Sequence, residues 1–358
     1  MKYIFDFCGM YFSQTILTWY HQNKRDLPWR TTQDPYVIWL SEIILQQTRV
    51  NQGISYFYTF LENYPTIRDF ANAPEDDILR HWQGLGYYSR ARNMTKAAQK
   101  VMSDFQGVFP TNYQELIKLP GIGEYTAAAI SSFSANEPNA VLDGNVSRVL
   151  SRYFGIKEAI NSTAGKKLFQ RMAQEVLPQE NAGIFNQAIM EFGALQCKPQ
   201  SPNCDRCPLK TDCYAFQNKE IHLLPSKLKA AKSKNRFFHY FIVRKGDSIL
   251  MQKRDGNDIW KNMYELPLIE TEEQVSDVQI QSSPQYRNAF GEKTSIIYQS
   301  QIIKHVLSHQ NIYARFYEIK DADEQRMIKK SRNYVLIKDL DKLAKPKLIY
   351  TFFDSFFT

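Results

Sequence analysis

Apolar side chains recur in short clusters over residues 10–215, and polar capping residues separate these clusters. This spacing predicts a series of short helices. One is expected to begin at Asp34-Pro35, because aspartate caps the start of a helix and proline fits its first position. Others are expected after Pro74, ending at Gly84-Leu85-Gly86, and after Thr111-Asn112-Tyr113. Short helices joined by short loops form a helical bundle rather than a sheet.

Beyond Cys213 the pattern changes. Residues 217–235 are rich in lysine, which is a linker composition. The runs Phe237–Arg244 and Ser248–Lys253 flank a Gly246-Asp247 turn and predict a hairpin. Further elements are expected as strands over Thr294–Lys304, Ile312–Lys320 and Tyr334–Ile337, and as a closing helix over residues 346–357. We therefore expect a helical domain over residues 1–216, a linker over 217–235 and an α+β domain over 236–358.

Length and composition are those of a globular protein of more than one domain. The chain has 358 residues, 43% of them hydrophobic and 23% charged. No apolar run is long enough to span a membrane, and Asp6 interrupts the short apolar run that a signal peptide would need. We expect a cytoplasmic protein. The net charge of +8 favours a polyanionic partner without requiring one.

A Gly-X-Gly turn precedes a predicted helix. The segment Leu119-Pro120-Gly121-Ile122-Gly123 leads into the run Glu124–Ser134. Glycines let the backbone approach a ligand closely, and the free N–H groups at a helix start bind anions. In a basic protein the expected anion is a nucleic-acid phosphate. A tight turn between two helices, with no ligand, would explain the same residues.

Two carboxylates stand at positions suited to different chemistry. Glu42 lies among apolar neighbours on the helix that follows Pro35, and burial would raise its pKa toward that of a general acid. Asp143 precedes another helix start, where the dipole and the N–H groups would hold it ionised. An acid and an anion of this kind together cleave glycosidic bonds. Taken singly, a glutamate on a helix is usually a solvated residue, and a structural N-cap explains the aspartate equally well.

Four of the five cysteines are closely spaced. They form the pattern C-x6-C-x2-C-x5-C at Cys197, Cys204, Cys207 and Cys213. Four neighbouring thiols in a cytosolic chain predict a metal site rather than disulfides. Zinc and an iron–sulfur cluster both accept four thiolates, and the spacing by itself does not separate them.

Taken together, these motifs resemble the MutY-type adenine DNA glycosylases of the endonuclease III, or helix-hairpin-helix, superfamily. The matching segments are, in order, Leu27-Pro28-Trp29-Arg30, the Glu42 helix, Gly84–Arg92, the Gly-X-Gly hairpin, the Asp143 segment, Phe185-Asn186-Gln187-Ala188 and the four cysteines. The resemblance implies a multi-domain protein: an all-α helix-hairpin-helix glycosylase domain with a [4Fe-4S] cluster loop, followed by an α+β Nudix-like domain. It also favours iron–sulfur over zinc.

The resemblance implies roles for individual residues. Glu42 would protonate an adenine flipped out of the duplex, and Asp143 would stabilise the oxocarbenium-like sugar before water completes an abasic site. Tyr125 stands where lyase members carry a Schiff-base lysine, which implies a monofunctional enzyme with weak or no lyase activity. The implied DNA contacts are a wedge of Gln47 and Tyr87, an adenine pocket of Trp29, Arg30 and Gln187, and a hairpin grip by Gly121 and Gly123.

The second domain carries a resemblance of its own. The segment 258–267 resembles the Nudix-like lesion-recognition domain of this family, but the Glu-rich helix of a working Nudix hydrolase is missing. The segment Val306-Leu307-Ser308-His309 resembles the family's Phe-Ser-His loop, in which Ser308 and His309 would bind 8-oxoguanine. Leu307 replaces the usual phenylalanine, so we expect weaker packing against the lesion strand.

The sequence thus predicts an enzyme of base excision repair. It would hydrolyse the N-glycosidic bond of adenine paired with 8-oxoguanine or guanine in double-stranded DNA. We expect a monomer without membrane contact, located with the chromosome in a bacterial cytoplasm.

Three other functions stay open. A thymine-mismatch glycosylase can also carry tyrosine at Tyr125, although the Nudix-like domain argues against it. A damage-binding protein without catalysis is disfavoured by the pair Glu42 and Asp143. A nucleotide hydrolase would lack its metal-binding glutamates.

Overall fold

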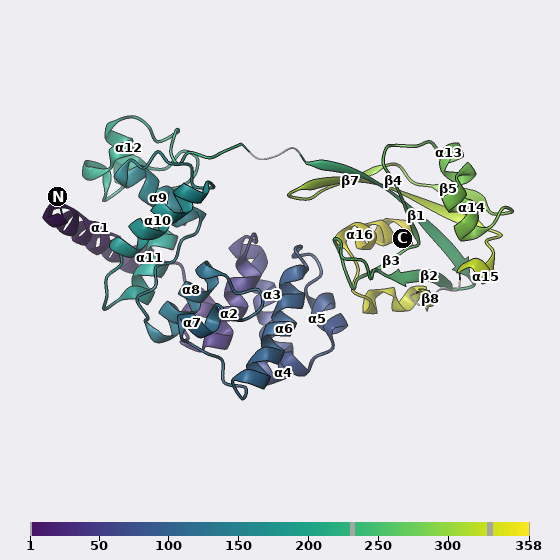
Figure 1. Ribbon diagram of the computed structural model, residues 1–358, viewed down its shortest axis with the longest axis horizontal. Helices are drawn as coiled ribbons and strands as arrows, with labels where there is room; N and C mark the ends of the chain where they lie inside the picture. The colour runs from purple at the N-terminus through teal and green to yellow at the C-terminus, as the bar shows by residue number, and fades with distance from the viewer. Residues whose placement is uncertain (1, 230–232, 328–331, 358) are drawn as a thin grey trace. The chain divides into compact units, whose positions relative to one another are not determined.

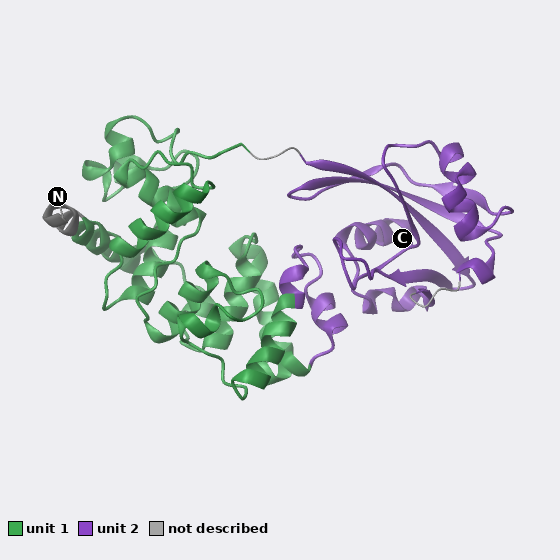
Figure 2. Ribbon diagram, in the orientation of Figure 1, with its two compact units in different colours: residues 1–72, 93–229 green, residues 73–92, 230–358 purple. Residues whose placement is uncertain are grey.

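The computed structural model describes residues 2–229, 233–327 and 332–357 (Figure 1). The chain divides into two compact units (Figure 2). Unit 1 comprises Met1–Asn72 and Asn93–Lys229, and unit 2 comprises Ala73–Arg92 and Ala230–Thr358. Within the described ranges, none of the helices combines the length and the hydropathy that a membrane crossing requires.

Unit 1 is helical, as the spacing of apolar clusters predicts. Its longer helices are α1 (Lys2–Asn23), α2 (Pro35–Leu45), α3 (Val50–Asn63), α8 (Glu124–Ala135), α9 (Gly144–Phe154), α10 (Thr163–Glu175) and α11 (Ala182–Leu195). The shorter elements are η1 (Pro28–Arg30), α4 (Ile67–Asn72), α7 (Tyr113–Leu116), η2 (Cys204–Arg206), η3 (Lys210–Asp212) and α12 (Tyr214–Gln217). Helix α6 (Ser89–Asp104) begins in unit 2 and continues into unit 1.

The predicted helix starts are confirmed. Asp34 caps α2 by accepting a hydrogen bond from the Tyr36 N–H at 2.8 Å, and Pro35 occupies the first turn. Helix α8 begins directly after Gly123. Asp143 is the N-cap of α9.

Helix α11 lies at the centre of unit 1 and packs against α1, α8 and α9. Its Phe185 and Phe192 are buried in a core shared with Phe12 of α1 and Tyr153 of α9. Helix α2 packs against α3 and α8, and its Trp39 contacts the rings of Phe70 and Phe109. This packing brings α2, α8, α9 and α11 together around one region of the unit.

One glycine is required for that packing. A Cβ atom at Gly193 of α11 would lie 2.7 Å from the Asn145 Cβ and 2.9 Å from the Asn145 carbonyl oxygen. Separations this short do not occur between real side chains, so a larger residue would push α9 away. Gly193 therefore lets the start of α9, with its N-cap Asp143, sit directly against α11.

Unit 2 is built on a mixed sheet. Strand β1 (Lys234–Lys245) pairs in parallel with β7 (Gln310–Lys320) over most of its length. It pairs antiparallel with β2 (Ser248–Lys253) and β4 (Leu268–Thr271). The remaining strands are β3 (Tyr264–Glu265), β5 (Ser295–Gln299), β6 (Ile303–Val306) and β8 (Arg332–Leu336), and the central order is β3-β2-β1-β7-β5.

Helices cover both faces of this sheet (Figure 1). On one face, α13 (Asp277–Ser282) and α14 (Pro284–Phe290) bury Tyr286 and Phe290 against Phe241. On the other, α16 (Lys347–Phe356) stacks Phe352 on Phe316. The other helical elements are α5 (Glu75–His81), α15 (Glu324–Met327) and η4 (Ile337–Lys342).

Most predicted elements of unit 2 are confirmed, with one correction. The β1–β2 hairpin forms, although β1 begins at Lys234, and α16 is the predicted closing helix. The single strand expected over Thr294–Lys304 is wrong, because this run divides into β5 and β6. The break lies at Ser300, whose backbone N–H and side-chain oxygen both bond to the Phe316 backbone. Residues 230–232 of the expected linker lie outside the described residues.

Candidate active site

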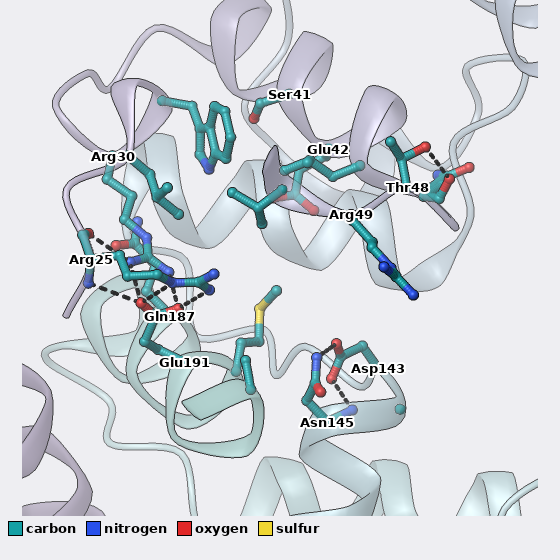
Figure 3. Close-up of a pocket in the computed structure, with 18 of the residues that line it drawn as sticks. Arg25, Arg30, Ser41, Glu42, Thr48, Arg49, Asp143, Asn145, Gln187 and Glu191 are labelled. Atoms are coloured by element: carbon teal, nitrogen blue, oxygen red, sulfur yellow. Dashed lines mark hydrogen bonds and ion pairs between the residues drawn. The ribbon is translucent and has the colours of Figure 1, made fainter. Parts of the chain in front are cut away.

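A cleft of about 1330 Å³ opens in unit 1 where α2, α8, α9 and α11 meet (Figure 3). Seven of the residues singled out in the sequence line it: Trp29, Arg30, Glu42, Gln47, Tyr125, Asp143 and Gln187. They come from elements that are far apart in the sequence. The cleft therefore unites the expected acid, the expected anion and the expected base pocket.

Glu42 is deeply buried in this cleft. Its side chain is on the apolar helix α2 and the residue is only 7% exposed. Burial raises the pKa of Glu42 to about 7, and the nearby charge of Asp143 also raises it, whereas a hydrogen bond from Tyr125 and the charge of Arg30 lower it. A carboxyl with this pKa is partly protonated near neutral pH and can act as a general acid. The predicted effect of burial is confirmed.

Tyr125 holds Glu42 in position. Its hydroxyl donates a hydrogen bond of 2.8 Å to Glu42 Oε2. Burial raises the pKa of Tyr125 well above 10, so the phenol stays protonated and remains a donor. Tyr125 lies in the first turn of α8, next to the Gly-X-Gly turn. The first turn of α8 thus links the Gly-X-Gly turn to Glu42 through the hydrogen bond of Tyr125.

Asp143 caps α9 with three hydrogen bonds to its carboxylate. The Asn145 and Val146 backbone N–H groups donate to Oδ1 at 2.8 and 2.7 Å, and the Asn145 side chain donates to Oδ2 at 2.7 Å. These bonds favour the ionised form. Burial, however, raises the pKa of Asp143 against the hydrogen bonds and the charge of Arg148, which lower it.

The expectation that the pKa values of the two carboxyls move in opposite directions is therefore wrong. Both are raised, and both by burial first. The sequence shows that an N-cap carboxylate has N–H donors nearby, but it does not show that the start of α9 is enclosed by α11.

An ion-pair cluster forms one end of the drawn site, and Asp143 with Asn145 lies at the other (Figure 3). Glu191 of α11 is 1% exposed and binds the guanidinium groups of Arg25 and Arg30 at 2.7 and 2.8 Å. Nearby, the Tyr20 hydroxyl donates a 2.9 Å hydrogen bond to the Gln187 side-chain oxygen. The Gln187 amide nitrogen is then left to donate within the cleft.

Three residues of this site escaped the sequence analysis: Arg25, Asn145 and Glu191. Glu191 had a readable signal, because it is the single acidic residue in the apolar helix Ala182–Leu195 and follows Gln187 by one helical turn. Asn145 follows Asp143 by two residues, a spacing at which a side chain can reach a cap. Arg25 gave no signal of its own.

The hairpin glycines lie outside the residues that line the cleft. Gly121 has a φ of +79°, and a Cβ atom there would lie 2.7 Å from the Asn93 Cβ, so only glycine fits this turn. Gly123 is exposed and caps α8 without a side-chain hydrogen bond to the first-turn N–H groups. The start of α8 therefore presents backbone donors to solvent.

The four cysteines of the loop after α11 are reduced and half-buried. Burial raises the pKa of Cys207 to about 12, and the thiols of the other three raise it further, so all four lie within electrostatic reach of one another. Arg152 places a guanidinium nitrogen 3.5 Å from the Cys197 sulfur. This cation would stabilise thiolates.

The four thiols are the ligands that this loop offers for the zinc or the iron–sulfur cluster that the sequence motif predicts. Across the described residues, no three His, Cys, Asp or Glu side chains form a group able to hold one metal ion. Tetrahedral zinc needs its sulfurs at about 2.3 Å from a single ion. In a four-iron cluster each thiolate binds a different iron. Four thiols in one loop therefore fit either group by their chemistry.

In unit 2, Tyr87, Ser308 and His309 line a second cavity of about 450 Å³. Tyr87 is exposed and has a φ of +46°, a strained conformation for a non-glycine residue. The Trp82 indole N–H braces the strained turn by donating to the Gly86 carbonyl at 2.9 Å. Ser308 Oγ lies 3.1 Å from His309 Nδ1, and both side chains are exposed.

Comparisons with known proteins identify the families that the two parts of the chain resemble. The model of the HhH-GPD superfamily of base excision DNA repair proteins matches residues 40–179, and the NUDIX domain model matches residues 239–355. The adenine DNA glycosylase of Buchnera aphidicola subsp. Baizongia pistaciae is 38% identical over 305 residues, covering 84% of each chain. The human adenine DNA glycosylase is 40% identical over 58% of this chain and 40% of its own length.

Solved structures resemble the helical part. A thermostable thymine-DNA glycosylase superposes with a TM-score of 0.55 at 31% identity and covers 59% of this chain and 97% of its own. A non-covalent endonuclease III–DNA complex superposes with a TM-score of 0.51 at 22% identity, covering 58% and 95%, and shows the shared fold.

The burial of Glu42 predicts a pH-dependent change in stability. Because its pKa of about 7 in the folded chain is above the ordinary value of 4.5, folding retains a proton, and stability falls as pH rises through this window. Glu42→Gln removes that loss. The variant should gain up to about 3 kcal/mol over the wild type between pH 4.5 and 8, since one pKa unit is worth about 1.4 kcal/mol.

This gain is measured as the free energy of urea unfolding of the DNA-free protein at pH 5 and at pH 8. The circular dichroism of the helices serves as the unfolding signal. Glu62→Gln, an exposed carboxylate on α3, is the matched control and should show no such gain. If the stability difference between Glu42→Gln and the wild type is the same at both pH values, the raised pKa of Glu42 is contradicted.

Proposed function

The chain belongs to the adenine DNA glycosylase family and is a DNA N-glycosylase of base excision repair, and from this premise we propose that its substrate is adenine paired with 8-oxoguanine or guanine in duplex DNA. The observation that carries the proposal is the buried Glu42, bonded to Tyr125 and sharing one cleft with Asp143. A flipped adenine would enter this cleft, because its glycosidic bond is out of reach within the stacked duplex.

Glu42 is the proposed general acid. Its pKa of about 7 leaves a fraction of the carboxyl protonated at neutral pH, and Tyr125 fixes the side chain by bonding to Oε2. Proton transfer to a ring nitrogen of adenine weakens the glycosidic bond, because the base then leaves as a neutral molecule. The arrangement supports acid-catalysed departure of a purine.

Asp143 is the proposed stabiliser of the sugar. As the glycosidic bond breaks, positive charge develops on the sugar, and a carboxylate nearby stabilises it or bonds to it transiently. The three hydrogen bonds from Asn145 and Val146 fix both carboxylate oxygens in place. Water then attacks the sugar and leaves an abasic site.

Trp29, Arg30 and Gln187 are the proposed base pocket. Trp29 is buried and offers an aromatic edge or face beside the cleft. Gln187 can donate through its amide nitrogen, because Tyr20 already occupies its oxygen. A donor suits the ring nitrogens of a purine, which accept hydrogen bonds.

We propose that the enzyme is monofunctional, with weak or no lyase activity. The position that would require a lysine for a Schiff base is Tyr125, whose hydroxyl is bonded to Glu42. Among the described residues that line the cleft there is no lysine. Hydrolysis is therefore supported over strand cleavage.

DNA binding is proposed to rest on the hairpin and on two wedge residues. The exposed N–H groups after Gly121 and Gly123 suit a phosphate, and the net charge of +8 favours the duplex. Gln47 and Tyr87 are both exposed and both have a positive φ, a strained backbone conformation that clusters at functional sites.

A monomer is proposed, because Glu42 and Asp143 line one cleft of a single chain. The bacterial relatives support a location with the chromosome in the cytoplasm.

Ser308 and His309 are the proposed readers of the lesion opposite adenine. Their side chains are exposed in the turn after β6 and line the same cavity as Tyr87. The hydroxyl and the imidazole can bond to the additional oxygen and N–H group of 8-oxoguanine. Leu307 offers an aliphatic rather than an aromatic contact.

We propose that Cys197, Cys204, Cys207 and Cys213 hold a [4Fe-4S] cluster. Such a cluster would supply structural closure of the loop, since it fixes four separate chain positions. The closed loop would then offer Lys198, Arg206 and Lys210 to DNA phosphates.

The main test is Glu42→Gln in single-turnover excision from an A:8-oxoguanine duplex, with Glu62→Gln as control. The amide has no titratable proton, so base loss should fall by at least about a hundredfold, the range of general acid catalysis. Duplex binding by gel shift should persist. Near-normal excision by Glu42→Gln would refute the role of Glu42 as the acid. Strand breaks made by the wild type before alkali treatment would refute the monofunctional assignment.

Lesion recognition is tested with the double change Ser308→Ala, His309→Ala. Excision from A:8-oxoguanine relative to A:G should fall about ten- to a hundredfold, because hydrogen bonds to one base contribute roughly 1–3 kcal/mol. Gln301→Ala, an exposed residue outside the cavity, is the control. An unchanged ratio would show that the lesion is read elsewhere.

The cluster is tested by metal analysis of the purified chain. We expect a yellow-brown protein with about four irons. Cys207→Ser should lose iron, whereas Cys8→Ser, outside the loop, should retain it. A colourless protein with one zinc would contradict the iron–sulfur assignment.

A further inference from the structure

We propose that Glu191 is the counter-charge of the base pocket: it holds Arg25 and Arg30 in place and cancels the positive field of Arg30 at Glu42. This inference rests on the proposed role of Glu42 as the acid. Glu191 is a positioning residue, since it acts through the two arginines.

The hydrogen bonds of Glu191 exclude direct contact with a base. Oε1 accepts from the Arg25 backbone N–H at 2.9 Å, from Arg25 Nε at 2.9 Å and from Arg30 Nη1 at 3.1 Å. Oε2 accepts from Arg25 Nη2 at 2.7 Å and Arg30 Nη2 at 2.8 Å. These bonds occupy both oxygens, and the residue is 1% exposed.

The charge of this cluster is set by Glu191. Burial tends to raise the pKa of Glu191, but hydrogen bonds from Arg25 and Arg30 lower it to about 2, so the carboxylate stays ionised at every pH of interest. Two guanidinium groups and one carboxylate leave a net charge of +1 beside the cleft. Without Glu191 the charge would be +2.

Arg30 is the member of the cluster that acts on Glu42. Its side chain is 14% exposed and lines the cleft with Glu42, and its charge lowers the pKa of Glu42. Without Glu191, the largely buried guanidinium of Arg30 would be an uncompensated charge, and it would attract the nearest remaining carboxylate. In the cleft the next carboxylates are Glu42 and Asp143, and pairing with Glu42 would remove the acidic proton.

Other groups around Glu42 do not replace Glu191. Facing it are Tyr125 from α8 and Asp143 from the start of α9, while α11 contributes the neutral Met190 and Gln187. Arg49 is exposed beside the cleft, and the buried Arg148 bonds to the carbonyls of Gly144, Gly193 and Cys197. Glu191 is thus the carboxylate bound directly to the arginine that acts on Glu42.

The experiment compares pH profiles of single-turnover adenine excision by the full chain between pH 5 and 9. In the wild type the rate should fall as Glu42 loses its proton near pH 7. Glu191→Gln keeps the shape but frees Arg30, so the falling limb should move about one unit lower. Excision at pH 8 should then drop about tenfold, with little change at pH 5.5.

A second variant predicts the opposite shift. Arg25→Met removes one positive charge and leaves Glu191 bound to Arg30, so the falling limb should move to higher pH. Because the Arg25 side chain is 36% exposed, this variant should fold even if Glu191→Gln does not. Glu175→Gln, an exposed carboxylate of α10, is the charge-matched control and should leave the limb in place.

A purely structural role for Glu191 would lower the rate equally at all pH values. The inference is overturned if the falling limb of the pH profile stays in place in the variants that fold. It is also overturned if Glu191→Gln and Arg25→Met move the limb in the same direction. Failure of the proposed function looks different: either the wild type does not release adenine, or Glu42→Gln remains active.

Discussion

The burial of one carboxyl group, that of Glu42, is the constraint on which the site depends. A charged side chain cannot be buried without partners, so either it keeps its proton or its surroundings supply compensating groups. Here the apolar helix α2 supplies the burial and Tyr125 supplies one hydrogen bond. The same burial that reduces stability at high pH retains the proton needed for a general acid.

Helix α9 connects the second carboxylate to the cysteine loop. Asp143 caps its start, and Arg148 and Arg152 project one helical turn apart from its later turns. Arg148 donates to the Cys197 carbonyl at 2.7 Å, and Arg152 donates to the Lys198 carbonyl at 2.7 Å. These arginines are buried, so the loop is fixed to α9 by bonds that water cannot replace. The geometry of the loop and that of Asp143 therefore depend on the same helix.

In unit 2, polar contacts tie residues 73–92 to the sheet part. Lys253 binds Asp76 at 2.7 Å, and Arg92 donates to the Lys261 carbonyl at 3.0 Å. The strained turn that carries Tyr87 lies in this segment and lines one cavity with Ser308. Tyr87 is distant from Ser308 in the sequence and yet shares a compact unit with it.

The sequence by itself determined the local elements and the residue types of the site. Caps such as Asp34 and Asp143, the Gly-X-Gly turn and the β1–β2 hairpin are local signals, and each forms as predicted. The burial of Glu42 was also readable, because most of its neighbours on α2 are apolar. Only the tertiary structure decided the pKa direction of Asp143, the pairing of Arg25 and Arg30 with Glu191, and the break at Ser300. Each of these depends on segments far apart in the chain, and periodicity along one segment carries no information about which distant side chain will enclose or neutralise it.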